Sequence, residues 1–122
     1  MCARLAGVLS AAAIAAGCSG PPAPDAAICQ DIIHRLCLPV RCSVATFTLG
    51  VGDDCEDDLL TRTGCSEDDF TFQEPLAREP VLQCRVALVR AGLSPEQLPN
   101  CADVSDMLEL CPDLTAFLRG AP

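Results

Sequence analysis

Hydrophobic residues recur at helical spacing in several short segments of the chain, and Pro or Gly residues separate these segments. The clearest pattern lies between Asp25, which is expected to cap a helix, and Pro39, which is expected to stop it. The apolar positions of this segment form one stripe: Ile28, Cys29, Ile32, Ile33, Leu36 and Cys37. We therefore predict a helix over residues 26–38 with one buried face.

A second helix is expected over residues 54–63. Asp53 or Asp54 would cap its start, it would run to about Arg62, and Gly64 would lie just past its end. Its buried stripe consists of Cys55, Leu59 and Leu60. The acids of its first turn suit the positive end of the helix dipole. They also leave open a calcium-dependent binding domain that uses the acids of 53–58 and 67–69, although the order of an EF-hand loop is missing.

Two more helices are expected in the second half of the chain. Pro80 suits the first turn of a helix over residues 80–91, which Gly92 closes. The last clear helix spans residues 102–110, and Pro112 separates it from one more apolar turn.

Two other segments are less regular. Residues 43–50 suit a short helix from Ser43 to Gly50, although their apolar residues also alternate as in a strand; we favour the helix. The run at 66–69 resembles a capping box but predicts only about one turn of helix. These patterns together predict an all-α fold, a small disulfide-stapled domain of about four to five short helices behind a cleaved signal segment.

The first residues have the features of a secretory signal. Arg4 supplies a positive charge, and about a dozen small and apolar residues follow it, too few to span a bilayer. The run ends in Ala15-Ala16-Gly17-Cys18, which resembles the lipobox of bacterial lipoproteins except that Ala15 stands where that family usually has Leu. In that family the Cys is acylated, for example with palmitate, and becomes the first residue of the mature chain.

This resemblance implies three parts: a lipoprotein-type signal peptide (1–17), a Pro-rich tether (18–25) and a Cys-rich helical domain (26–122). Three prolines between Ser19 and Asp25 favour an extended tether of about 20 Å. The mature region also resembles the small Cys-, Arg- and Ala-rich predicted lipoproteins of GC-rich bacteria such as myxobacteria. That likeness implies a compact domain in the cell envelope, anchored by lipid, with the outer membrane favoured.

Charge excludes several classes of partner. Removal of residues 1–17 leaves 105 residues with seven Arg against 17 acids, a formal charge of −10. Such a surface repels phosphate groups, so nucleic acids and anionic lipid headgroups are poor partners. The only large rings are four Phe, so the core is expected to be thin and to need cross-links.

The ten cysteines are the most informative residues. Cys2 leaves with the signal and Cys18 is consumed by acylation, which leaves eight, enough for four disulfides. Cleavage by a standard signal peptidase before Ala16 would leave nine cysteines, one of them unpaired. The even number that remains after acylation of Cys18 therefore favours lipidation. Zinc and redox motifs need Cys-x2-Cys pairs, whereas at least four residues separate successive cysteines among these eight.

Helix geometry restricts how the eight cysteines can pair. If the helices at 26–38 and 54–63 pack antiparallel, the end of the first meets the start of the second. This packing brings Cys37 near Cys55 and Cys29 near Cys65. The same arrangement of the last two helices puts Cys84, early in one, beside Cys111, late in the other. Cys42 and Cys101, which are expected in connecting segments, then close the fourth bond. The expected bonds are Cys29–Cys65, Cys37–Cys55, Cys42–Cys101 and Cys84–Cys111.

No pattern of catalytic residues is present. The chain has one His, His34, which is expected to be a solvated helix residue rather than a catalytic one, and it has no Gly-x-Ser-x-Gly motif. It also lacks the Trp and Tyr platforms on which glycosidases bind sugars. We expect no enzyme activity, no catalytic residue, no cofactor and no metal site.

The expected function is that of a lipid-anchored envelope protein, a binding or structural module exposed to the periplasm or the exterior. Its partners would be the membrane, through the lipid on Cys18, and another envelope protein. Two alternatives remain open: a secreted, unlipidated effector or inhibitor, and the calcium-dependent binding domain.

Overall fold

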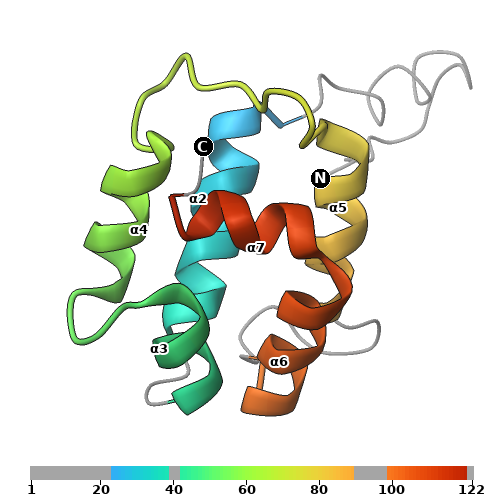
Figure 1. Ribbon diagram of the computed structural model, residues 1–122. Coiled ribbons are helices and arrows are strands. Elements are labelled where there is room, and N and C mark those ends of the chain that lie inside the picture. Colours follow the sequence, from blue (N-terminus) through green and yellow to red (C-terminus); the bar gives the residue numbers. More distant parts are fainter. Residues whose placement is uncertain (1–22, 39–41, 90–98, 121–122) are drawn as a thin grey trace, which may run out of the picture.

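A computed structural model describes residues 23–38, 42–89 and 99–120, and helices account for most of them (Figure 1). These are α2 (Asp25–Cys37), α3 (Ser43–Leu49), α4 (Cys55–Thr63), α5 (Arg78–Arg85), the 3-10 helix η2 (Val86–Leu88), α6 (Cys101–Leu110) and α7 (Pro112–Leu118). The described ranges contain no strand, so the all-α prediction is confirmed and the segment at 43–50 is helical. Their six α-helices exceed the expected four to five because α3 and α7 both form.

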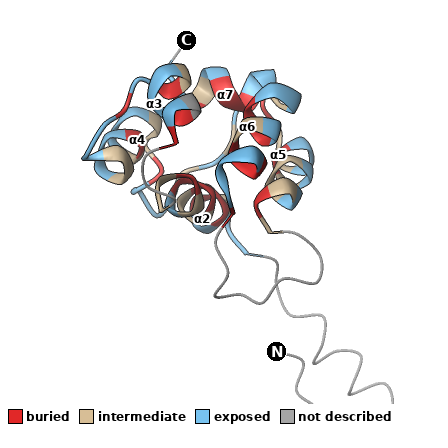
Figure 2. Cartoon of the chain, turned by 90° about the horizontal axis from the view of Figure 1, so that it is seen from below, coloured by how far each residue is buried: buried red, intermediate tan, exposed pale blue. Residues whose placement is uncertain are grey.

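The central helix is α2, and its buried face is the predicted apolar stripe. Its buried residues are Ala26, Ile28, Cys29, Ile32, Ile33 and Leu36. One side of α2 packs against α4 and the other against α5 and η2, while α7 runs across the bundle and contacts α3, α4 and α6 (Figure 1). Figure 2 shows that the buried residues of the helices face inward.

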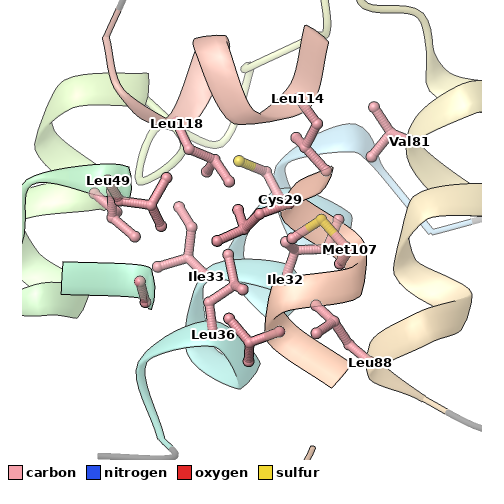
Figure 3. Close-up of a cluster of buried hydrophobic side chains, with 14 of the residues drawn as sticks. Cys29, Ile32, Ile33, Leu36, Leu49, Val81, Leu88, Met107, Leu114 and Leu118 are labelled. Atoms are coloured by element: carbon pink, nitrogen blue, oxygen red, sulfur yellow. The ribbon is translucent and has the colours of Figure 1, made fainter. Parts of the chain in front are cut away.

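The core is made of aliphatic side chains from all the helices. Figure 3 shows Ile32, Ile33 and Leu36 of α2 among residues from the helices around them. None of the four Phe residues belongs to the fully buried set. Phe70, Phe72 and Phe117 instead form a partly buried cluster, with ring centroids 5.1 to 6.0 Å apart. The core is therefore free of aromatic rings, and branched aliphatic residues fill it.

Several helix ends follow their sequence signals. Gly50 and Gly64 end α3 and α4 with φ of 65° and 77°, the left-handed region that favours glycine. Pro112 occupies the first turn of α7. The start of α6 has a capping box that the prediction missed: Asn100 and Asp103 each accept a hydrogen bond from the other's backbone N–H, so α6 begins one residue earlier than expected.

Asp25 does not cap α2, contrary to the prediction. The cap position is Pro24, and Asp25 is the first residue of the helix. Its carboxylate accepts hydrogen bonds from the Phe72 backbone N–H (3.0 Å) and from Arg78 Nη1 (2.6 Å). Arg78 Nη2 donates to the carbonyl of Ala23 (2.6 Å). We call Ala23, Asp25, Phe72 and Arg78 the amino-terminal clasp.

Arg62 of α4 joins the carboxyl ends of two other helices. Its Nη1 donates to the carbonyl of Leu49 (2.5 Å) and, more weakly, to that of Leu118 (3.5 Å), and its Nη2 donates to the carbonyl of Gly50 (2.7 Å). These carbonyls lie at the ends of α3 and α7, where a cation suits the negative end of the helix dipole.

Four disulfides cross-link the helices: Cys29–Cys65, Cys37–Cys55, Cys42–Cys101 and Cys84–Cys111. These are the pairs expected from two antiparallel hairpins. Two details of that argument are wrong. Cys84 lies near the end of α5 rather than early in a helix over 80–91, and Cys101 is the first residue of α6 rather than part of a connecting segment. The segment divides into α5 and η2, and α6 packs against both, so Cys84 still meets Cys111.

The disulfides also indicate the compartment. The described residues contain no free cysteine, and such bonds persist in oxidising surroundings, so the protein is extracytoplasmic. Within the described ranges, no helix has both the length and the apolar character that crossing a bilayer requires.

Candidate functional site

The predicted lipidation site, Cys18, lies outside the described residues, as do the signal peptide and residues 19–22 of the tether. The eight cysteines after Cys18 all lie within the described ranges, and each is bonded to another of the eight. No thiol of the described domain is therefore left to pair with Cys18.

The acids at the start of α4 do not form a metal site. Across the part of the chain that the structure describes, no three His, Cys, Asp or Glu side chains come together in an arrangement that could hold an ion. Asp54 occupies the cap position of α4 but makes no capping hydrogen bond with its side chain. The calcium-dependent alternative thus has no ligand set in the described residues.

His34 lies on the surface of α2, as expected for a solvated helix residue. Its Nδ1 is 3.3 Å from Oε2 of Glu56 on α4, and 52% of the His34 side chain and 45% of the Glu56 side chain are exposed. This is a solvated surface pair between two helices, and no nucleophile accompanies it in the contacts of the described residues.

The strongest candidate for a binding site is a hollow at the carboxyl end of α2. It has a volume of about 470 Å³ and lies among the end of α2, α3 and the start of α4. Its apolar lining includes Leu36, Ala45, Phe47 and Val51, together with the Cys37–Cys55 disulfide. We call it the α3 hollow. Its volume falls in the range of pockets that bind small molecules or side chains.

Phe47 stands at the edge of this hollow and is 84% exposed. Ala45 and Leu49 of α3 are buried, and Phe47 lies midway between them. A residue midway between two helix positions that are four apart faces the opposite side of the helix. An exposed ring of this size lacks the hydrophobic stabilisation of about 2 kcal/mol that its burial would contribute. Val86 and Leu110 are also exposed, but neither lines the α3 hollow.

One acidic residue, Asp53, lines the α3 hollow, and further acids follow it in the sequence at the start of α4. These are Asp54, Asp57 and Asp58, which are exposed. None of these four carboxylates forms an ion pair with another described residue. They give this part of the surface a negative potential.

The arginines of the described helices are largely engaged elsewhere. Arg35 Nε and Arg85 Nε both donate to Oδ2 of Asp31, at 3.0 and 2.7 Å, and this links α2 to α5. Burial alone would raise the pKa of Asp31, but the hydrogen bonds from Arg85 and Arg35 outweigh it and hold that pKa below its ordinary value. Arg78 is held in the clasp. These arginines therefore neutralise carboxylates of the helix contacts and not those beside the α3 hollow.

A second, smaller hollow of about 280 Å³ also includes Phe47. Its lining contains Arg62 and Arg119 with the backbone around Gly50. Phe47 therefore contributes to two hollows, one lined by Asp53 and the other by Arg62 and Arg119.

Comparison of the chain with protein-family models, with curated proteins and with solved structures finds no match in any of the three. What the site can do must follow from its own residues.

Proposed function

We propose that the protein is a lipid-anchored binding module of the bacterial cell envelope, attached through an acylated Cys18 and without catalytic activity. The observation that carries this proposal is the pairing of all eight cysteines after Cys18 with one another. Cys18 then has no disulfide partner in the described domain, and the lipobox-like Ala15-Ala16-Gly17-Cys18 gives it a role as the acylated residue.

The positions of the clasp and the hollow support the binding role. The clasp holds the start of α2, where the tether joins the domain, whereas the α3 hollow is lined by residues at the other end of the same helix. Figure 1 shows α3 beside that far end of α2. The 13 residues of α2 span about 20 Å at 1.5 Å per residue. An anchor at Cys18 would leave the hollow at the end of the domain that is distant from the tether, where a partner has access.

Metabolic labelling with a fatty-acid analogue and membrane fractionation test the anchor. We expect the parent chain to carry the label and to remain with the membrane, and the Cys18→Ser variant to lose both. Cys2→Ser is the matched control, since it removes a cysteine but leaves the lipobox-like residues intact. Equal membrane recovery of Cys18→Ser and parent would sink the proposal, and an unlabelled parent in the soluble fraction would favour the secreted alternative.

A further inference from the structure

We propose that the α3 hollow docks a cationic segment of another envelope protein, with one large apolar side chain of that segment inserted beside Phe47. This assignment of the partner rests on the proposed function of a binding module. It commits to a polypeptide partner that combines an apolar anchor with Lys or Arg residues.

The apolar half of this proposal follows from the lining. Phe47 is 84% exposed, while Leu36, Ala45 and Val51 beside it are buried residues of the core. The hollow thus connects an exposed ring to the edge of the packed interior. Large side chains inserted into such sites dominate the affinity of protein interfaces. Phe47 would lose its exposure when an apolar side chain enters the hollow.

The cationic half follows from charge. Asp53 lines the hollow, and Asp54, Asp57 and Asp58 follow it in exposed positions at the start of α4, without ion-pair partners among the described residues. Complementary charge speeds association and disfavours wrong partners. A second copy of this chain is disfavoured because the whole chain carries a net charge of −9, and anionic lipid headgroups are disfavoured for the same reason.

Two arginines that share the smaller hollow with Phe47 give the docked segment a direction. Arg62 and Arg119 line the smaller hollow, where they would repel Lys and Arg residues. The cationic residues of the partner would therefore lie towards Asp53 and the start of α4, away from Arg62 in its last turn, and its apolar anchor would lie next to Phe47.

Site-specific photocross-linking in the cells that produce the protein tests this proposal. A photoreactive phenylalanine analogue replaces Phe47 in the full chain, and the same analogue replaces Val86, which is 58% exposed but does not line the hollow, as the control. We expect one polypeptide adduct from position 47 at several times the yield from position 86. The cross-linked peptide of the partner should carry a net positive charge and a large apolar residue.

Charge variants then separate docking from incidental contact. With the analogue at position 47, Asp53→Lys with Asp57→Lys should lower the adduct yield at least about tenfold. Glu109→Lys with Asp113→Lys changes two exposed acids outside the hollow by the same total charge and should change the yield less than about twofold. Thermal unfolding verifies that both double variants are folded.

Several results would overturn the docking proposal: an adduct with a second copy, an adduct with lipid alone, an acidic contact peptide, equal loss in both double variants, or no adduct above the Val86 control. The anchor is judged separately, from the membrane fraction of Cys18→Ser. If that variant stays on the membrane while the yields at position 47 follow expectation, the anchor is wrong and the docking site stands.

Discussion

The guanidinium of Arg78 lies 2.6 Å from a carboxylate oxygen of Asp25, although 53 residues separate the two along the chain. The same carboxylate accepts the backbone N–H of Phe72, so the segment between α4 and α5 is fastened to the first residue of α2. Asp25 and Arg78 are 16% and 32% exposed, so solvent weakens this ion pair less than it weakens pairs on the open surface.

We expect Asp25→Ala to lower the free energy of unfolding by about 1 to 3 kcal/mol, because it removes two charge-assisted hydrogen bonds and leaves the Phe72 N–H without its partner. Guanidinium denaturation without reductant measures the change. Asp113→Ala, at an exposed acid in the first turn of α7, is the control and should change it by less than about 0.5 kcal/mol. Equal stability of the Asp25 variant and the parent would contradict the role given to the clasp.

Arg62 should matter more to stability than Arg119, although both line the smaller hollow. Arg62→Ala removes hydrogen bonds to the carbonyls of Leu49 and Gly50, and we expect a loss of about 1.5 to 3 kcal/mol. Arg62→Lys should recover only part of it, because an ammonium group lacks the planar fork that reaches both carbonyls. Arg119→Ala, at an exposed residue, serves as the control in the same denaturation experiment, and a loss as large as that of Arg62→Ala would refute this account.

Asp31 should make stability depend on pH. Its pKa is lower in the folded chain than the ordinary value of 3.8, so the carboxylate stabilises the fold above that value. The stabilisation is lost as the pH falls through the folded-state pKa. Asp31→Asn should therefore be less stable than the parent by about 1 kcal/mol at pH 7, and the difference should shrink below pH 4.

Denaturation of parent and variant across this pH range measures the Asp31 effect. Asp68→Asn, at an exposed acid that takes part in none of the ion pairs of the described residues, should differ from the parent by less than about 0.5 kcal/mol throughout. If Asp31→Asn and the parent differed in the free energy of unfolding by the same amount at every pH, the charge of Asp31 would not be the cause of the difference.

The disulfide pattern can be mapped by cleavage after Arg without reduction. The fragment 63–78, which contains Cys65, should be linked only to the fragment that contains Cys29. The other six cysteines should hold the fragments 36–41, 42–62, 79–85 and 91–119 in a second linked set. Further cleavage at aspartates separates Cys42 from Cys55 at Asp53 and Cys101 from Cys111 at Asp103 or Asp106, which resolves the pairs within that set. Any link between the two sets would mean a different connectivity.

Local patterns predicted much of this fold. Periodicity and capping rules find features whose causes lie within a few residues of each other. Such features include the apolar stripe of α2, the acid-rich start of α4 and the glycines at 50 and 64. The disulfide pairs followed from the lengths of antiparallel helices. Asn100 and Asp103 show that one local signal was missed, since Asn-x-x-Asp is itself a capping pattern.

Other features depend on contacts between distant segments. The local sequence favours a capping role for Asp25, because its actual partners Phe72 and Arg78 are 47 and 53 residues away and no local pattern reveals them. Arg62 looked like an ordinary helix end for the same reason, although it binds carbonyls of α3 and α7. The candidate site was not predicted at all. Phe47 alternates with Leu49 and Val51 as a core residue would, and only the helical form of α3 puts it on the exposed side.

The Cys29–Cys65 bond has a mechanical consequence for a domain that is pulled from its amino terminus. Force on Ala23 would first break the hydrogen bonds of Arg78 and Asp25 and then unwind α2 from its start. Unwinding must stop at Cys29, because that residue is covalently joined to the turn after α4. Residues 23–28 thus extend before the bond takes the load, and they measure roughly 20 Å at full stretch. Beyond that length the load can pass through the Cys29–Cys65 bond and bypass residues 30–64, which that bond closes into a loop.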